Sequence, residues 1–284
     1  MEDYYDQETL HKVQNVQKEI LKDVLKICEE NGIDVFAVFG TALGIVRHQG
    51  FIPWDDDIDV AMLRKDFIKF KKIAKIKLAD RYEFLTPETN KHYAATVVHF
   101  QKKGTKFVSM DAKECDYTQG ICIDIFVYDN LADKKLDRKI QYFMAWFLGR
   151  LVFLSGKGTP FIPYSGITKT IITGAFSLVR KGLRLFRVTP LKIYRKFQSV
   201  SQRYNRKKTE YYVAFEPPKP WLNAMSRQDL YPLKKMKFDD FYMNVPNNVD
   251  KHLKAIFGDY MQLPPVEKRK NHRPYLVEFG DDKI

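Results

Sequence analysis

The chain has 284 residues, of which 45% are hydrophobic and 29% charged, and its formal net charge is +13. These values are typical of one large globular domain, or of a domain with an insertion. The positive charge is concentrated in residues 138–209, which hold 16 of the 48 lysines and arginines and no acidic residue. Cys28, Cys115 and Cys122 show no metal-ligand spacing, and we interpret them as small core residues in a reducing compartment rather than as a disulfide framework.

The first half of the chain alternates between helical and strand patterns. Apolar residues at three- and four-residue steps predict a helix over residues 8–31, which Asn31-Gly32 ends. An apolar run predicts a strand over 33–39, ended by Gly40-Thr41 before a short helix over 42–47. The other predicted elements are a strand over 57–62, a helix over 64–79, and strands over 82–85, 94–101, 106–110 and 120–130. This alternation predicts an α+β fold with a mixed sheet core flanked by helices.

The basic segment is predicted to be a largely helical insertion. Residues 140–154 are apolar but interrupted by Gly149 and Arg150, and residues 166–186 and 193–208 are amphipathic or basic. Short strands and a helix near 250–257 follow it. The predicted division is therefore a body formed by residues 1–137 and 210–284, with an insertion over 138–209.

An acidic cluster stands in the stretch "VFGTALGIVRHQGFIPWDDDIDVAM" (residues 38–62). Asp55, Asp57 and Asp59 share one face if the strand begins early enough, whereas Asp56 points away and has a structural role. Carboxylates on one face repel each other unless a cation lies nearby, and oxygen ligands of this kind suit Mg²⁺ or Mn²⁺. The alternative is a solvated turn before a strand.

Other residues of this stretch suit phosphate binding. The backbone amides of Gly40 and Thr41 are expected to approach an anion, and Arg47 and His48 add donor groups. Asp124 lies alone among apolar residues of the strand over 120–130, where burial without a partner is costly. A small-residue turn, an Asp-x-Asp strand and a third carboxylate on a later strand are the pattern of a nucleotidyltransferase-like fold. His48 alone would more often be a surface histidine.

The sequence resembles the LicD family, which includes the fukutin-type enzymes, in three stretches. These are "FGTALGIVRHQGFIPWDDDIDVAMLRKDF" (residues 39–67), "DIF" (124–126) and "FGDYMQLPPVEKRKNH" (257–272). The resemblance implies catalytic roles for Asp57, Asp59 and Asp124 and a Mg²⁺ or Mn²⁺ site that also includes Asp55. In the third stretch, Arg269 and His272 either close the nucleotide-binding site or stabilise the fold.

The resemblance also implies a reaction. A phosphoalcohol, which is phosphocholine, ribitol phosphate or glycerol phosphate, would move from a CDP-activated donor to a sugar hydroxyl. The acceptor would be a cell-surface glycan precursor of teichoic acid, capsule or lipopolysaccharide. One alternative is a nucleotidyltransferase that transfers NMP to a small molecule or RNA, and another is a non-enzymatic basic surface protein.

The basic segment is expected to bind an anionic membrane surface. Acidic residues follow Met1 and no apolar run reaches about 18 residues, so neither a signal peptide nor a spanning helix is predicted. The expected location is cytoplasmic, at the inner face of the cell membrane, where a glycolipid acceptor would lie. The alternatives are a helical subdomain with its own core and, less in keeping with the family, a nucleic-acid-binding surface, so no nucleic-acid partner is expected.

Overall fold

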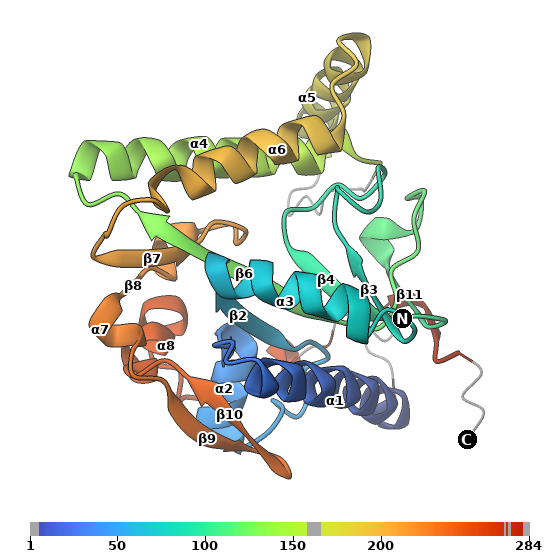
Figure 1. The fold of residues 1–284 in the computed structure, drawn as a ribbon. Coiled ribbons are helices and arrows are strands. Elements are labelled where there is room, and N and C mark those ends of the chain that lie inside the picture. Colours follow the sequence, from blue (N-terminus) through green and yellow to red (C-terminus); the bar gives the residue numbers. More distant parts are fainter. Residues whose placement is uncertain (1–5, 158–165, 270, 272–273, 281–284) are drawn as a thin grey trace.

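The computed structural model describes residues 6–157, 166–269, 271 and 274–280 (Figure 1). Its helices are α1 (Gln7–Glu30), α2 (Phe39–His48), α3 (Arg64–Lys77), α4 (Lys135–Ser155), α5 (Gly166–Leu185), α6 (Pro190–Ser201), α7 (Arg227–Leu230) and α8 (Val249–Phe257). Its strands are β1 (Phe36–Ala37), β2 (Asp59–Leu63), β3 (Tyr82–Leu85), β4 (Val98–Lys102), β5 (Lys106–Ser109), β6 (Cys122–Leu131), β7 (Tyr211–Ala214), β8 (Met225–Ser226), β9 (Lys234–Phe238), β10 (Phe241–Val245) and β11 (Pro274–Glu278).

The main sheet is mixed and centres on β6. Its strand order is β1-β2-β6-β4-β3, and β7 also pairs with β6 and carries β8. Only β2 and β6 run parallel, and every other neighbouring pair in the sheet is antiparallel. Two ribbons complete the described strands, β9 with β10 and β5 with β11. The predicted α+β class with a mixed sheet and flanking helices is therefore confirmed.

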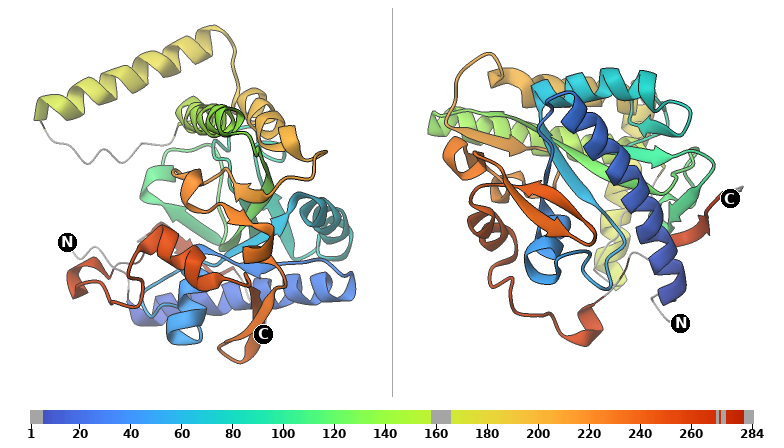
Figure 2. Two further views of the ribbon diagram at one scale, coloured as in Figure 1. Left: turned by 90° about the vertical axis from the view of Figure 1, so that its left-hand side faces the viewer. Right: turned by 60° about the horizontal axis from the view of Figure 1, so that its bottom comes forward.

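The helices divide the apolar interior into separate clusters. The largest cluster contains the buried face of α1 and α3, with Ile20 and Phe70, packed against Ile125 of β6. A second cluster joins α4 and α6 to the end of the sheet, where Phe197 packs against Val213. Figure 1 shows α4 and α6 side by side, and α5 extends away from the other helices in Figure 2. Two helices of the basic segment thus share a core with the sheet.

Several predicted boundaries were wrong for identifiable reasons. The strand expected over 33–39 has only two paired residues, because the chain turns into α2 at Phe39 and Gly40-Thr41 lie inside the helix. Gly149 and Arg150 do not interrupt α4, which runs unbroken. A Cβ on Gly149 would lie 3.9 Å from Thr96 and 4.0 Å from Phe197, so this position is a close packing contact of the helix.

Glu216, which follows β7, is buried, and its Oε2 has no hydrogen-bond partner among the residues that the structure describes. Burial raises the pKa of this carboxyl to about 8. The folded state therefore holds a proton that the unfolded state has lost above its ordinary pKa of 4.5. The contribution of this group to the free energy of unfolding is therefore complete below pH 4.5, and it is lost as the pH rises through about 8.

Glu216→Gln removes this titration. We expect the wild-type free energy of unfolding to fall by about 2 kcal/mol between about pH 6 and about pH 8 through this group, and the variant to lack this fall. Urea unfolding at several pH values measures the difference. The same pH slope in both proteins would contradict the assignment.

Candidate metal and phosphate site

The carboxylates of three aspartates converge on the first turn of α2. A Cβ atom on Gly40 would lie 3.0 Å from Asp55 Oδ2, 3.5 Å from Asp59 Oδ2 and 3.7 Å from Asp57 Oδ1. The Gly40 amide donates to Asp59 Oδ2 at 3.1 Å, and the Asp59 amide donates to Thr41 Oγ1 at 2.7 Å. The missing side chain at position 40 thus leaves room for three acidic groups, and the Gly40 amide already binds one of them.

The structure brings these residues together differently from the expected common strand face. Because β2 begins at Asp59, Asp55 and Asp57 belong to the preceding loop rather than to a strand. The fourth aspartate comes from the neighbouring strand, since Asp59 of β2 and Asp124 of β6 are paired in register. His99 of β4 lies opposite Asp124 on the other side, and its Nε2 is 3.4 Å from Asp124 Oδ1. A loop and two parallel strands therefore supply the four acids.

Asp59 is the buried member of the group, and its charged form is destabilised by burial and by the neighbouring carboxylates. Burial raises the pKa of the Asp59 carboxyl well above its ordinary value, and three nearby carboxylates raise it further. In decreasing order of effect these belong to Asp57, Asp124 and Asp55. A divalent cation among the four would remove this repulsion and replace the lost hydration of Asp59. The oxygen-rich donor set fits Mg²⁺ or Mn²⁺.

A second set of potential ligands adjoins the aspartates. One ligand atom each of His99, Cys122 and Asp124 lies within 4.8 Å of the other two. Burial raises the pKa of the Cys122 thiol, so the thiol stays protonated and is a weak ligand. Burial lowers the pKa of His99 to about 4, so its imidazole is neutral. Within this set, Asp124 and His99 are the groups able to bind a cation near neutral pH.

Two buried glutamines of α1 hold the acidic loop in place. Gln14 Nε2 donates to the carbonyl of Asp55 at 2.8 Å, and Gln17 Nε2 donates to the carbonyl of Asp56 at 2.7 Å. Gln17 Nε2 also lies 3.1 Å from the carbonyl oxygen of Cys122, at the start of β6. One amide group therefore ties the loop before β2 to the strand that carries Asp124.

Two of the predicted phosphate-binding residues, His48 and Arg269, contact Trp54, which directly precedes Asp55 in the chain. The Arg269 guanidinium stands 5.2 Å from the Trp54 ring centroid, and His48 contacts the same ring edge-on. Arg47 donates to the Tyr260 carbonyl at 2.7 Å, and its pKa is lowered by burial and by the charge of Arg269. The C-terminal motif thus reaches the N-terminal one. His272 lies outside the described residues.

Sequence reasoning missed three residues that support the site, namely Gln14, Gln17 and His99. The two glutamines occupy the apolar face of an otherwise regular amphipathic helix, which is the signal that could have identified them. His99 could have been found only with the strand order, because its pairing with Asp124 joins segments that the sequence does not relate.

Comparisons with known proteins find a family and two relatives that this chain resembles. Residues 32–144 match the family described as "LicD/FKTN/FKRP, nucleotidyltransferase domain". The chain is 27% identical, over 93% of its length and 96% of the relative's, to the lipopolysaccharide cholinephosphotransferase LicD of Haemophilus influenzae. It is also 42% identical over 55 residues, 19% of the chain and 18% of the relative, to an uncharacterised protein of Rickettsia typhi. The matched domain contains all four aspartates, and the resemblance found in the sequence is confirmed.

Proposed function

We propose that this chain, which carries a LicD-family domain over residues 32–144, is a metal-dependent phosphotransferase. It would move a phosphoalcohol, most simply phosphocholine, from a CDP-activated donor to a sugar hydroxyl of a cell-surface glycan precursor. The observation that supports the proposal is the clustering of four aspartates. Asp55, Asp57 and Asp59 lie around Gly40, and Asp124 of β6 is paired with Asp59 of β2. The naming of the Haemophilus relative supports the phosphocholine and lipopolysaccharide parts.

The four aspartates would hold one or two Mg²⁺ ions. When bound, the metal supplies positive charge to the diphosphate of the donor and to the leaving CMP. The chain itself provides the fixed frame, in which Thr41 and the Gly40 amide orient Asp59. His48 and Arg269 contact the Trp54 ring, and Arg47 Nε donates to His48 Nε2 at 2.9 Å. We assign these three residues to the phosphates and nucleotide of the donor. His272 of the same motif is assigned with them.

Asp124 is the proposed base for the acceptor. Its carboxylate would take the proton of the sugar hydroxyl while the new bond from that oxygen to phosphorus forms and the bond from phosphorus to the CMP oxygen breaks. The neutral imidazole of His99 lies beside this carboxylate, with its Nε2 3.4 Å from Asp124 Oδ1. His99 Nε2 also lies 3.3 Å from the hydroxyl of Tyr93, which fixes the imidazole in turn.

The same aspartates could serve transfer of CMP if the acceptor attacked the other phosphorus, so the test must identify the group that moves. The purified full chain is incubated with Mg²⁺ and a panel of CDP-choline, CDP-ribitol and CDP-glycerol, with and without a glycolipid acceptor. We expect acceptor-dependent CMP release with one donor, and a mass increase of the acceptor equal to the phosphoalcohol. An increase equal to CMP would instead establish the nucleotidyltransferase alternative.

Gly40→Ala tests the crowding at the first turn of α2. The added methyl group would stand 3.0 Å from Asp55 Oδ2 and displace it. We expect transfer to fall by about tenfold to a hundredfold with the midpoint of thermal unfolding nearly unchanged, because alanine favours the helix. Steady-state rates at varied Mg²⁺ and a melting curve make the comparison. Gly182→Ala, in open space on α5, is the matched control.

We propose that the insertion, residues 138–209, binds an anionic membrane surface at the cytoplasmic face. The body formed by residues 1–137 and 210–284 would carry out the transfer. Within the described ranges, no helix combines the length and apolar character needed to cross a bilayer. The α4 helix nevertheless exposes Phe143, Trp146 and Phe147 by 59%, 38% and 43% in a segment without acidic residues. Exposed aromatic groups beside cations suit insertion at a lipid interface.

Flotation with vesicles of neutral or anionic lipid tests this assignment. We expect retention only on anionic vesicles, released at about 0.5 M salt, and reduced about fivefold by the double variant Phe143→Ser/Phe147→Ser. Ile76→Ser, which changes a 77% exposed apolar residue of α3, is the control. Equal binding to both vesicle types would contradict electrostatic docking.

A further inference from the structure

A large basic cavity lies at the opposite end of the strands that carry the aspartates. Its volume is about 810 Å³, and its walls include Leu63 at the end of β2 and Tyr128 near the end of β6. Leu63 and Tyr128 are paired in register, four residues beyond the pair of Asp59 and Asp124. At about 3.3 Å per residue, the cavity begins about 13 Å from the acidic pair. It is therefore a separate place on the same two strands.

Cationic side chains reach this cavity from three walls. Arg64 and Lys65 come from the start of α3, Arg227 from α7, and a third group from the loop after α6. The loop group consists of Arg206, Lys207 and Lys208. Among the described residues of the lining, Asp34 is the one acidic side chain, and it accepts a hydrogen bond from Tyr231 at 3.1 Å. The cavity thus carries a strong excess of positive charge.

Most of these cations have no acidic partner among the residues that the structure describes. Arg206, Lys207 and Lys208 are exposed and form no ion pair there. Arg227 stacks on the Tyr212 ring at 4.6 Å and donates to a hydroxyl and a carbonyl, which leaves further guanidinium hydrogens available. Their charge is therefore available to a ligand.

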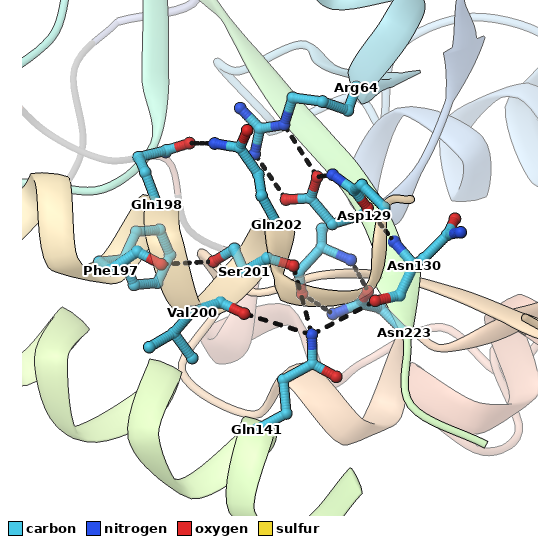
Figure 3. A network of polar contacts seen from close by, with 12 residues as sticks. Arg64, Asp129, Asn130, Gln141, Phe197, Gln198, Val200, Ser201, Gln202 and Asn223 are labelled. Carbon is cyan, nitrogen blue, oxygen red and sulfur yellow. Dashed lines mark hydrogen bonds and ion pairs between the residues drawn. The ribbon is translucent and has the colours of Figure 1, made fainter. Parts of the chain in front are cut away.

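Hydrogen bonds to the end of β6 fix the loop that carries the third group. Asp129 is 1% exposed and accepts a hydrogen bond of 2.8 Å from Arg64 Nε (Figure 3). It also accepts one of 2.5 Å from Asn205 Nδ2. The amide of Asn130 donates to Asn205 Oδ1 at 2.8 Å, and its side chain donates to the carbonyl of Lys207. The end of β6 therefore holds the cationic loop in a defined position beside α3.

We propose that this cavity is a second anion-binding site, distinct from the aspartate cluster, for an organic molecule that carries two or more phosphate groups. The six cationic side chains of the described lining offer more donor groups than one phosphate can use, and arginine and lysine together suit several phosphate oxygens. The volume exceeds that of a diphosphate alone, and the rings of Tyr128, Tyr212 and Tyr231 provide walls for the organic part. The inference does not depend on the proposed transfer reaction.

Calorimetric binding of inorganic pyrophosphate to the full chain, with EDTA present, tests the site. Without a divalent metal, the aspartate cluster repels this probe. We expect binding that weakens by about tenfold in Lys207→Glu/Lys208→Glu and also in Lys65→Glu, which changes a different wall. Lys26→Glu/Lys72→Glu reverses two exposed lysines on α1 and α3 and serves as the charge-matched control.

The proposal is overturned if pyrophosphate binds all these variants equally, or does not bind the wild type at millimolar concentration. Asp57→Asn should leave the affinity unchanged, and a large change would place the probe at the aspartates instead. Vesicles containing phosphatidylglycerol distinguish the source of the phosphates. Competition between pyrophosphate and vesicles would identify a lipid headgroup, and independent binding would identify a free phosphorylated molecule.

Discussion

Asp57→Asn is expected to abolish phosphoalcohol transfer while the protein stays folded. Asp57 Oδ1 lies in the group of carboxylates around Gly40, and its charge contributes to the raised pKa of Asp59. An amide in its place removes one negative metal ligand without changing the shape of the side chain. We expect a fall in turnover of about 1,000-fold, measured as CMP release with Mg²⁺ and a saturating donor.

The control for this prediction is Asp80→Asn, which changes an exposed aspartate in the turn after α3. It should retain wild-type turnover. The thermal unfolding midpoint of Asp57→Asn should lie within about 3 °C of that of the wild type, since surface and loop substitutions rarely shift stability further. Near-normal turnover in Asp57→Asn, with normal folding, would refute the assignment of the acidic cluster to the metal.

Asp129→Ala is expected to destabilise the fold by about 3–5 kcal/mol. The Asp129 carboxylate is buried and binds Arg64 through two hydrogen bonds of 2.8 and 2.5 Å, and it also accepts from Asn205. Arg64 is itself only 13% exposed in its side chain. The variant would leave this guanidinium without its carboxylate partner at the wall of the basic cavity, where only a small part of it meets solvent. Urea unfolding, with the midpoint and slope both fitted, measures the loss.

Two further variants separate the unpaired charge from the missing contact. In Arg64→Met/Asp129→Leu both charges are absent, and most of the lost stability should return because the desolvation cost disappears with them. Glu8→Ala breaks the exposed ion pair with Lys12, whose atoms lie 2.6 Å apart, and should leave the free energy of unfolding almost unchanged. Equal destabilisation by the single and double variants would show that packing, rather than charge, is responsible.

The sequence predicted the elements whose signals are local. The amphipathic period of α1, the boundary of β3 and the alternation of β6 all match the structure, because each is set by burial of one face. The start of α2 was misplaced because apolar residues before Gly40 suit a strand or a helix equally well. The pairing of β5 with β11 joins residues far apart in the chain, and no local pattern encodes it.

The sequence predicted which acidic residues form the candidate site, but not which elements of the fold carry them. The acidic residues stood out because charge is rare after an apolar run, and the register of Asp59 with Asp124 brings them together as expected. The route by which Asp55 and Asp57 approach was different, since a loop rather than a strand face carries them. The supporting groups on α1 and β4 are visible only when the three-dimensional neighbours are known.

The double contact of Gln17 has a consequence for truncated forms of the protein. Its one side-chain amide bonds the carbonyls of Asp56 and Cys122, which lie 66 positions apart in the chain. A fragment that begins after α1 would keep the four aspartates of the site but lose the hydrogen bonds that join their loop to β6. The aspartate loop therefore cannot be moved alone into another protein with its geometry intact, because α1 would have to be moved with it.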